Sequence, residues 1–476
     1  MDNQENRSEL KVETGQSDNT GSGNKSEQEN KLKNAPVGRL LFSLALPAIA
    51  AQIVNLLYNM VDRIYIGHIP ETGALALTGL GVAFPIIILI AAFSALFGFG
   101  GAPRASIEMG RGNHEKAEEI MGNSFCALVL SGVLLTIVFT IYCDPLLYMF
   151  GASESTITYA SEYLRIYVLG SVFVLVTTGM NAYITSQGFA KTAMLTTLIG
   201  AGLNIVLDPL FIFAFGMGVK GAALATIISQ SVSAIWVFKF LTGKKTILKL
   251  KKKNIRIKPS VIGPVMALGV SPFIMQSTES LISVCFNTSL LKYGGDVAVG
   301  AMTILTSVMQ FAMMPLHGVT QGMQPIVSYN YGAKNMSRVR RAFKITLITC
   351  LVYTTVIWLA VELKPELFAR LFSGEEELIK YSAWALRIYL GSICLFGAQI
   401  ACQQTFVALG KAVHSLFLAV LRKIILLIPL IYILPAFIDN KAFAVFLAEP
   451  IADFVAVAST ITLFSLTIGK LMRKEK

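Results

Sequence analysis

The stretch Gly202-Leu203-Asn204-Ile205-Val206-Leu207-Asp208-Pro209-Leu210-Phe211 places an amide, a carboxylate and a proline inside an apolar run long enough to cross a bilayer. A charge at the bilayer centre costs about 3 kcal/mol even on a mild insertion scale, so we expect Asp208 to face protein or a water-filled cavity. Asn204 lies one helical turn earlier on the same face. Pro209 has no N–H for the carbonyl of Ile205, which leaves that oxygen free.

Together these carboxylate, amide and carbonyl oxygens suit a proton or a small hard cation. Ionisable groups at membrane depth are functional hypotheses by default, and we interpret Asp208 as an ion-binding residue. The alternative is an aspartate paired with a basic residue that only holds helices together.

The composition indicates an integral membrane protein. Of its 476 residues, 54% are hydrophobic and 14% are charged, and the mean hydropathy is +0.64. The net charge of +12 could suggest a nucleic-acid-binding protein. The basic residues, however, lie between apolar runs on alternate loops, which is typical of membrane topology and argues against nucleic acid. The six cysteines are scattered without metal or disulfide spacing.

From Leu40 onward the sequence contains about twelve apolar runs, each long enough to span a membrane. We therefore predict an all-α integral membrane protein with about twelve transmembrane helices. The lysine-rich segment after the sixth run and the basic C-terminus are predicted to be cytoplasmic by the positive-inside rule. Both termini are then cytoplasmic, in a multi-pass protein of the cell membrane.

Four regions follow from this pattern. Residues 1–35 are polar and are predicted to form a disordered cytoplasmic tail, without the apolar core of a signal peptide. Residues 36–242 are predicted to form an N-terminal six-helix lobe, 243–258 a basic cytoplasmic linker, and 259–476 a C-terminal six-helix lobe.

An internal repeat relates the two lobes. Residues in the first half recur 222 positions later, as in the pairs Gly73 and Gly295, Pro103 and Pro325, and Gly110 and Gly332. Leu164-Arg165-Ile166-Tyr167 likewise recurs as Leu386-Arg387-Ile388-Tyr389. A duplicated unit of six helices inserts twice in the same orientation, which predicts two pseudo-symmetric bundles with a binding cavity between them, an architecture typical of transporters.

Polar residues inside the apolar runs fall on helix faces. The first run has Gln52, Asn55, Asn59 and Asp62 on one face, and its repeat partner has Gln276, Glu279, Ser283 and Asn287 on one face. Thr226, Gln230, Gln310, His317, Gln321 and Gln324 extend this polar lining. The alternative for the uncharged members is interhelical hydrogen bonding. For Asp62 it is an interfacial ion pair with Arg63, and Glu449 and Asp453 are further acids without an assigned role, of which Glu449 would lie at the interface.

Three segments resemble the multidrug and toxic compound extrusion (MATE) family, closest to the prokaryotic branch that includes the MepA and DinF types. They are the Asn204 to Asp208 motif with its proline, Tyr58-Asn59-Met60-Val61-Asp62-Arg63-Ile64-Tyr65-Ile66-Gly67, and Gln321-Gly322-Met323-Gln324-Pro325. The resemblance covers nearly everything after the tail. It implies a MATE-like fold and export of bulky amphipathic cations in exchange for inward protons or sodium.

The resemblance also implies particular sites. Ion coupling, with a sodium site if Na⁺ is the ion, falls on Asp62, Asn204, Asp208 and Thr226. The substrate cavity falls on Gln52, Asn55, Asn59, Gln276, Glu279, Gln310 and His317. Glu279 resembles an acid that the NorM branch uses in its C-terminal half, so the chain shows features of both branches. No cofactor beyond the coupling ion, and a monomer, are expected.

Other classes of membrane protein share some of these features. Flippases for lipid-linked sugars share the architecture but line the cavity with several basic residues, whereas the membrane-depth charges here are mostly acidic. A narrow metabolite exporter of the same superfamily also fits. A major-facilitator transporter would carry an Asp-x-x-Gly-Arg-Arg loop where this chain has Gly110-Arg111-Gly112-Asn113-His114. No metal, phosphate-loop or nucleophile motif indicates an enzyme.

Overall fold

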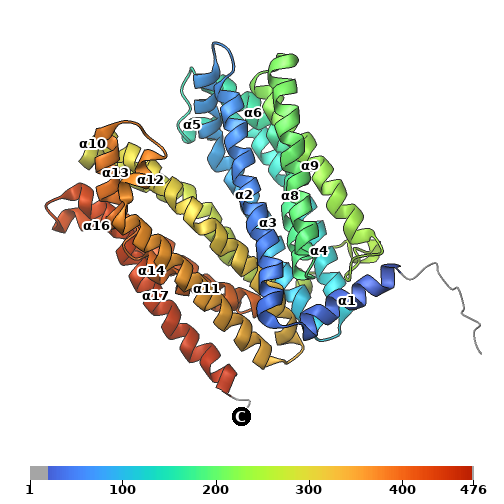
Figure 1. Cartoon of the computed structure of the whole chain (residues 1–476). Helices are drawn as coiled ribbons and strands as arrows, with labels where there is room; N and C mark the ends of the chain where they lie inside the picture. The colour runs from blue at the N-terminus through green and yellow to red at the C-terminus, as the bar shows by residue number, and fades with distance from the viewer. Residues whose placement is uncertain (1–19, 474–476) are drawn as a thin grey trace, which may run out of the picture.

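The computed structural model describes residues 20–473, and every regular element in that range is a helix (Figure 1). Nine helices in this range are long and apolar enough to cross a membrane, or up to 11 if each of two bent pairs is one span. The longest of them, α10 (Pro259–Gly332), is two helices divided at Gly295, whose φ of 66° is non-helical. The described residues therefore supply about twelve spans, and the predicted all-α membrane fold is confirmed.

The helices form two lobes after α1 (Thr20–Asn34). Those of the first lobe are α2 (Val37–Gly67), α3 (Gly73–Gly110), α4 (His114–Ile141), α5 (Cys143–Met149), α6 (Ile157–Leu169), α7 (Ser171–Ser186), α8 (Ala190–Pro209), the π-helix η1 (Leu210–Ala214) and α9 (Val219–Thr242). A short 3₁₀-helix, η2 (Lys252–Asn254), precedes the second lobe. Those of the second lobe are α10, α11 (Met336–Leu363), α12 (Pro365–Arg370), α13 (Glu376–Tyr389), α14 (Ile393–Ala408), α15 (Ala412–Val420), the π-helix η3 (Leu421–Leu427), α16 (Ile428–Phe437) and α17 (Lys441–Arg473).

The predicted repeat is visible in the helix boundaries. The bounds of α4 and α7 recur 222 positions later as those of α11 and α14. Asn113 caps α4 by accepting from the backbone N–H of Lys116, and Asn335 caps α11 in the same way from Arg338, both at 3.3 Å. The bent pair α6 and α7 (57°) has its counterpart in α13 and α14 (50°). The two lobes are thus copies of one six-span unit.

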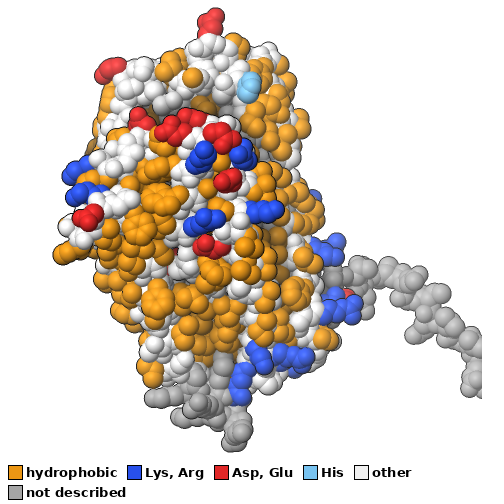
Figure 2. All heavy atoms as spheres, turned by 60° about the vertical axis from the view of Figure 1, so that its left-hand side comes forward, with side chains coloured by type: hydrophobic (Ala, Val, Ile, Leu, Met, Phe, Trp, Pro, Cys, Tyr) orange, Lys and Arg blue, Asp and Glu red, His pale blue; other side chains and the backbone are white. Residues whose placement is uncertain are grey.

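The outer surface fits a bilayer. Figure 2 shows a broad belt of hydrophobic side chains on the visible face, with charged side chains above it and Lys and Arg below it. On α2 the large exposed apolar residues Ile53, Leu57, Met60 and Ile64 lie at helical spacing on one face. Exposed hydrocarbon on this scale, over helices long enough to span a bilayer, fits a surface that faces lipid.

The lobes pack most closely at the end that carries α1, residues 243–258 and the turn between α3 and α4, here called the basic end. Figure 1 shows the helices converging toward this end and diverging toward the other. A Cβ on Gly110 would overlap the carbonyl of Tyr329, and one on its repeat partner Gly332 would overlap the carbonyl of Ile107. Gly269 is equally close to the backbone of Leu96. Backbones in such contact leave no passage between the lobes at the basic end.

The prediction of a disordered tail over residues 1–35 is wrong for Thr20–Asn34, which form α1, and residues 1–19 lie outside the described range. Leu32 is fully buried. Its carbonyl accepts from Asn330 Nδ2 (3.1 Å) and from Arg338 Nη2 (3.2 Å), both in the second lobe. Gln28 Nε2 donates to the carbonyl of Gly188 in the first lobe (2.6 Å). The segment α1 is therefore ordered although its composition is polar, because Leu32 anchors it and hydrogen bonds join it to both lobes.

The basic segment 243–258 also packs on the first lobe. The backbone N–H groups of Lys249 and Lys258 donate to the side chains of Glu118 (3.0 Å) and Asn123 (2.7 Å) on α4. Leu248 is fully buried. Its N–H donates to Gln187 Oε1 (2.8 Å). The segment is therefore held in place rather than free as a tether.

Leu32→Ala is expected to release α1, because it removes a fully buried apolar anchor of that helix at a cost of about 2–5 kcal/mol. Limited proteolysis and hydrogen exchange of residues 27–36 would detect the release. Lys33→Ala, at the exposed neighbouring position, is the matched control. Equal protection in the two variants would contradict docking through Leu32.

Gly269→Ala and Gly332→Ala are expected to lower the thermal midpoint. The added Cβ would overlap backbone atoms of Leu96 or Ile107, and such overpacking costs about 1–3 kcal/mol. Gly263→Ala in the same helix is the control, since a Cβ there meets nothing within 4 Å and alanine favours the helix. If all three variants melted alike, the close approach of the lobes at the basic end would not be needed for stability.

Candidate functional site

Asp62, Asn204, Asp208 and Thr226 meet inside the first lobe, where α2 and α9 pack against α8. All four are buried, and Asp208 is fully so. Asn204 Nδ2 donates to Asp208 Oδ1 (3.0 Å) and to Thr226 Oγ1 (3.4 Å). The carboxyl group of Asp62 lies within hydrogen-bonding reach of that of Asp208. The sequence-predicted set is therefore one cluster, here called the first-lobe site.

The first-lobe site has more acceptor oxygens than donors. Asp62 Oδ1, Asn204 Oδ1 and Asp208 Oδ2 are buried and have no hydrogen-bond partner among the described residues. Buried polar atoms are almost always satisfied, and two adjacent carboxylates repel each other unless a proton or cation lies between them. The atoms that could bind a cation here are all oxygens, which suits H⁺ or Na⁺.

The alternative readings of the two aspartates are not observed. Among the described residues, neither Asp62 nor Asp208 forms an ion pair. The guanidinium group of Arg63 instead lies 4.7 Å from the ring centroid of Phe84. The aspartates therefore do not simply pair with a basic residue to hold helices together.

The chain changes its helical geometry beside this site. Helix α8 ends at Pro209 and continues directly into the π-helix η1. Proline removes one backbone hydrogen bond, and π-helical turns occur often at functional sites. Tyr163 of α6 is also buried here, with its hydroxyl close to Thr226. Sequence reasoning missed Tyr163 because a tyrosine in an apolar run has the same pattern as a core aromatic.

The predicted cavity residues are divided between the lobes. Asn55 and Asn59 are exposed on α2, and Gln52 is half-buried there. Gln276 is half-buried on α10, where Glu279, Gln310 and His317 are exposed. Of this second group only Glu279 forms a side-chain ion pair or hydrogen bond in the described structure, with Lys423.

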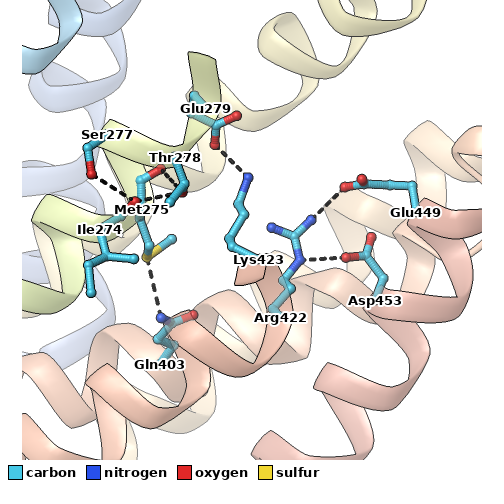
Figure 3. A network of polar contacts seen from close by, with 10 residues as sticks. All are labelled: Ile274, Met275, Ser277, Thr278, Glu279, Gln403, Arg422, Lys423, Glu449 and Asp453. Carbon is cyan, nitrogen blue, oxygen red and sulfur yellow. Dashed lines mark hydrogen bonds and ion pairs between the residues drawn. The ribbon is translucent and has the colours of Figure 1, made fainter. Parts of the chain in front are cut away.

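Five charged side chains form the second-lobe network: Glu279, Arg422, Lys423, Glu449 and Asp453 (Figure 3). Lys423 Nζ lies 2.7 Å from Glu279 Oε1. Arg422 donates to Glu449 (2.8 Å) and to Asp453 (2.6 Å). Ser392 adds a hydrogen bond to Asp453 (3.4 Å).

Burial separates one member of this network from the rest. The side chains of Arg422, Lys423, Glu449 and Asp453 are at most 7% exposed. That of Glu279 is 55% exposed. The basic groups nearest to it in electrostatic effect are Lys423, Arg422 and His317, so its exposed carboxylate belongs to a polar part of the second lobe.

The network extends one sequence-based expectation and corrects another. The charges of the two sites are mostly acidic, as expected, but Arg422 and Lys423, which the sequence analysis did not place at membrane depth, are also buried inside a span. Glu449 was expected at the interface but is 4% exposed. The signal was present as Leu421-Arg422-Lys423-Ile424 within an apolar run. Sequence reasoning missed it because adjacent basic residues resemble the edge of a cytoplasmic loop.

The chain is similar to known transporters over nearly its whole length. The MatE family model matches residues 47–210 and 272–433, once in each lobe. The multidrug export protein MepA of Staphylococcus haemolyticus is 22% identical over 94% of this chain and 98% of its own length.

Two solved structures share the fold. The MATE multidrug transporter DinF-BH, in complex with a dye, has a TM-score of 0.83 and 36% identity over 90% of this chain and 95% of its own. An outward-facing MATE family transporter of the MOP superfamily has a TM-score of 0.86 and 23% identity over 94% of this chain and 98% of its own.

Arg422→Met is expected to destabilise the protein strongly, because it leaves Glu449 and Asp453 buried without a cation, at a cost of about 3–5 kcal/mol. The thermal midpoint of the purified protein measures this. Arg165→Met is the matched control, since Arg165 pairs with Asp144 at 2.8 Å with its side chain 55% exposed and such pairs contribute little. Equal losses in the two variants would contradict a special role for the buried pair.

Proposed function

Because the chain belongs to the MATE family of transporters, we propose that it is a secondary active multidrug efflux antiporter. It exports amphipathic organic cations in exchange for inward H⁺ or Na⁺ by alternating access. The observation that carries this proposal is the first-lobe site, a buried pair of carboxyl groups with unpartnered oxygens inside a membrane span. Such a site can bind a cation and holds no group arranged for a catalytic step. We therefore propose a transporter rather than an enzyme.

The names of two similar proteins support drugs as the class of cargo. MepA is named a multidrug export protein, and DinF-BH is described in complex with a dye. We propose the same kind of cargo here, small amphipathic drugs of positive charge. Acidic groups outnumber basic ones across the first-lobe site and the second-lobe network, which favours cations over anions.

The membrane orientation follows from charge. Lysines are concentrated in 243–258 at the basic end, and the positive-inside rule places that end, with both termini, in the cytoplasm. The lobes are closed there and diverge at the opposite end (Figure 1). In the cell membrane this arrangement is outward-facing, the state in which cargo leaves and the coupling ion enters.

Coupling follows from charge neutralisation. A cation that binds between Asp62 and Asp208 removes their mutual repulsion and lets α2 and α8 pack more closely. The π-turn after Pro209 gives α8 a place to bend. Ion and cargo then favour different arrangements of the lobes, which is coupling by population shift.

The driving force is sufficient for antiport. One charge that moves inward across about 100 mV releases about 2.3 kcal/mol, and one pH unit adds about 1.4 kcal/mol. Exchange of one proton for one monovalent cation cancels the electrical contribution. More than one ion per cargo molecule therefore supports a steeper gradient of exported drug.

The alternative is a lipid-linked saccharide flippase or a narrow metabolite exporter of the same superfamily. Arg422 and Lys423 are the observation in its favour, because phosphate binding requires basic groups. Both, however, are already paired with carboxylates. We propose a monomer for either function, since each lobe buries its own charges. We propose no nucleic-acid partner.

Asp208→Asn is expected to abolish ion-driven transport, because the amide cannot exchange a proton or neutralise a cation. The measurement is uptake of a monovalent cationic dye into inverted vesicles under an imposed proton gradient and then a sodium gradient. Uptake driven by one gradient names the coupling ion.

Asp144→Asn is the control, since Asp144 lies in a surface ion pair with its side chain 44% exposed. Dye movement by folded wild-type protein under neither gradient would refute the antiporter and favour the flippase or metabolite exporter. Normal uptake by Asp208→Asn would refute the role of Asp208.

A further inference from the structure

The second-lobe network holds one carboxylate more than it holds cations. Glu279, Glu449 and Asp453 face only Arg422 and Lys423. Arg422 serves Glu449 and Asp453 together, while Lys423 serves Glu279 alone (Figure 3). The uncompensated negative charge therefore lies with the pair Glu449 and Asp453 as long as Lys423 remains on Glu279.

Glu279 is the open member of this network. Its side chain is 55% exposed while that of Lys423 is 7% exposed. An arriving cation can thus reach Glu279 directly, whereas the other four side chains of the network are closed to it. It finds that carboxylate already occupied by an ammonium group of the protein itself.

We propose that Lys423 is a tethered competitor of the cargo, which occupies Glu279 when the cavity is empty and leaves it when a cationic molecule binds. This inference rests on the proposed function and adds a specificity-determining residue that the first-lobe site does not contain. The cargo class it selects is the monovalent organic cation, because one positive charge replaces another on Glu279.

Lys423 has a second place to go. It lies within electrostatic reach of Glu449 as well as Glu279. The uncompensated charge of Glu449 and Asp453 attracts it there, and its four-carbon stem is flexible. It belongs to the π-helix η3, which also carries Arg422. When Lys423 moves toward Glu449, the carboxylate of Glu279 is left unpaired and can bind a cargo cation.

Other charged or titratable groups near this exchange are few. His317 of α10 lies near Glu279, and Tyr389 of α13 lies near Glu279, Glu449 and Asp453. The basic groups that act most strongly on Glu279 are Lys423, Arg422 and His317. Lys423 is the one at ion-pair distance.

The test is binding of ethidium, a monovalent cationic dye, to purified protein by fluorescence polarisation. Lys423→Met is expected to bind the dye about fivefold more tightly or better, within the usual range of coupling between two sites. Its maximal transport rate in proteoliposomes is expected to fall, because no internal cation expels the cargo. Glu279 stays hydrated when Lys423 is removed, so the variant is expected to fold.

Four further variants test whether Lys423 acts through Glu279. Glu279→Gln is expected to weaken binding, and the double variant Glu279→Gln with Lys423→Met is expected to match it. Lys423→Arg is expected to restore wild-type affinity. Lys441→Met is the control, because Lys441 lies 5.7 Å from the ring centroid of Tyr293 and outside the network.

Two outcomes would overturn the inference. Binding by Lys423→Met that is unchanged or weaker, as in Glu279→Gln, would make Lys423 a structural partner only. A gain in affinity that persists in the double variant would show that it does not act through Glu279. Neither outcome touches the proposed function, which stands or falls with gradient-driven uptake by the wild-type protein and its loss in Asp208→Asn.

Discussion

The cost of a charge in hydrocarbon governs this molecule. Carboxylates inside a span are tolerated only where protein groups, a proton or a cation compensate them. The two lobes meet this constraint differently. The first-lobe site leaves oxygens of Asp62 and Asp208 without partners among the described residues. The second-lobe network instead supplies its own cations, Arg422 and Lys423. We therefore propose that the first lobe takes up an ion from outside, and that a cargo cation displaces Lys423 in the second lobe.

Duplication explains how two chemistries arise on one framework. Helix boundaries, caps and bends repeat at an offset of 222 positions. A π-helix lies beside or around the functional residues in each copy, as η1 after Asp208 and η3 around Lys423. The two π-helices do not fall at equivalent positions of the repeat, since η1 would recur at 432–436 and η3 is Leu421–Leu427. Each copy therefore has its own irregular turn, and irregular backbone at membrane depth is where polar groups gather.

Much of the fold was predictable, because transmembrane spans and a repeat leave strong patterns in hydropathy and residue spacing. The grouping of Asn204 with Asp208 followed from helical periodicity alone, while Asp62 and Thr226 came from the family resemblance. What failed depended on long-range contacts. Nothing local to Leu32 indicates that it is buried, since its partners Asn330 and Arg338 are 298 and 306 positions away. Likewise, the pairing of Lys423 with Glu279 joins two spans whose proximity no local pattern reveals.

The basic end is where the two lobes are held together. Gly110 and Gly332 bring the backbones of α3 and α10 into contact there, and α1 adds hydrogen bonds to both lobes across the same junction. Opening toward the basic side has to break both kinds of contact, which costs free energy. In the antiport that we propose, ion entry at the first-lobe site and cargo release at the second-lobe network together supply that free energy.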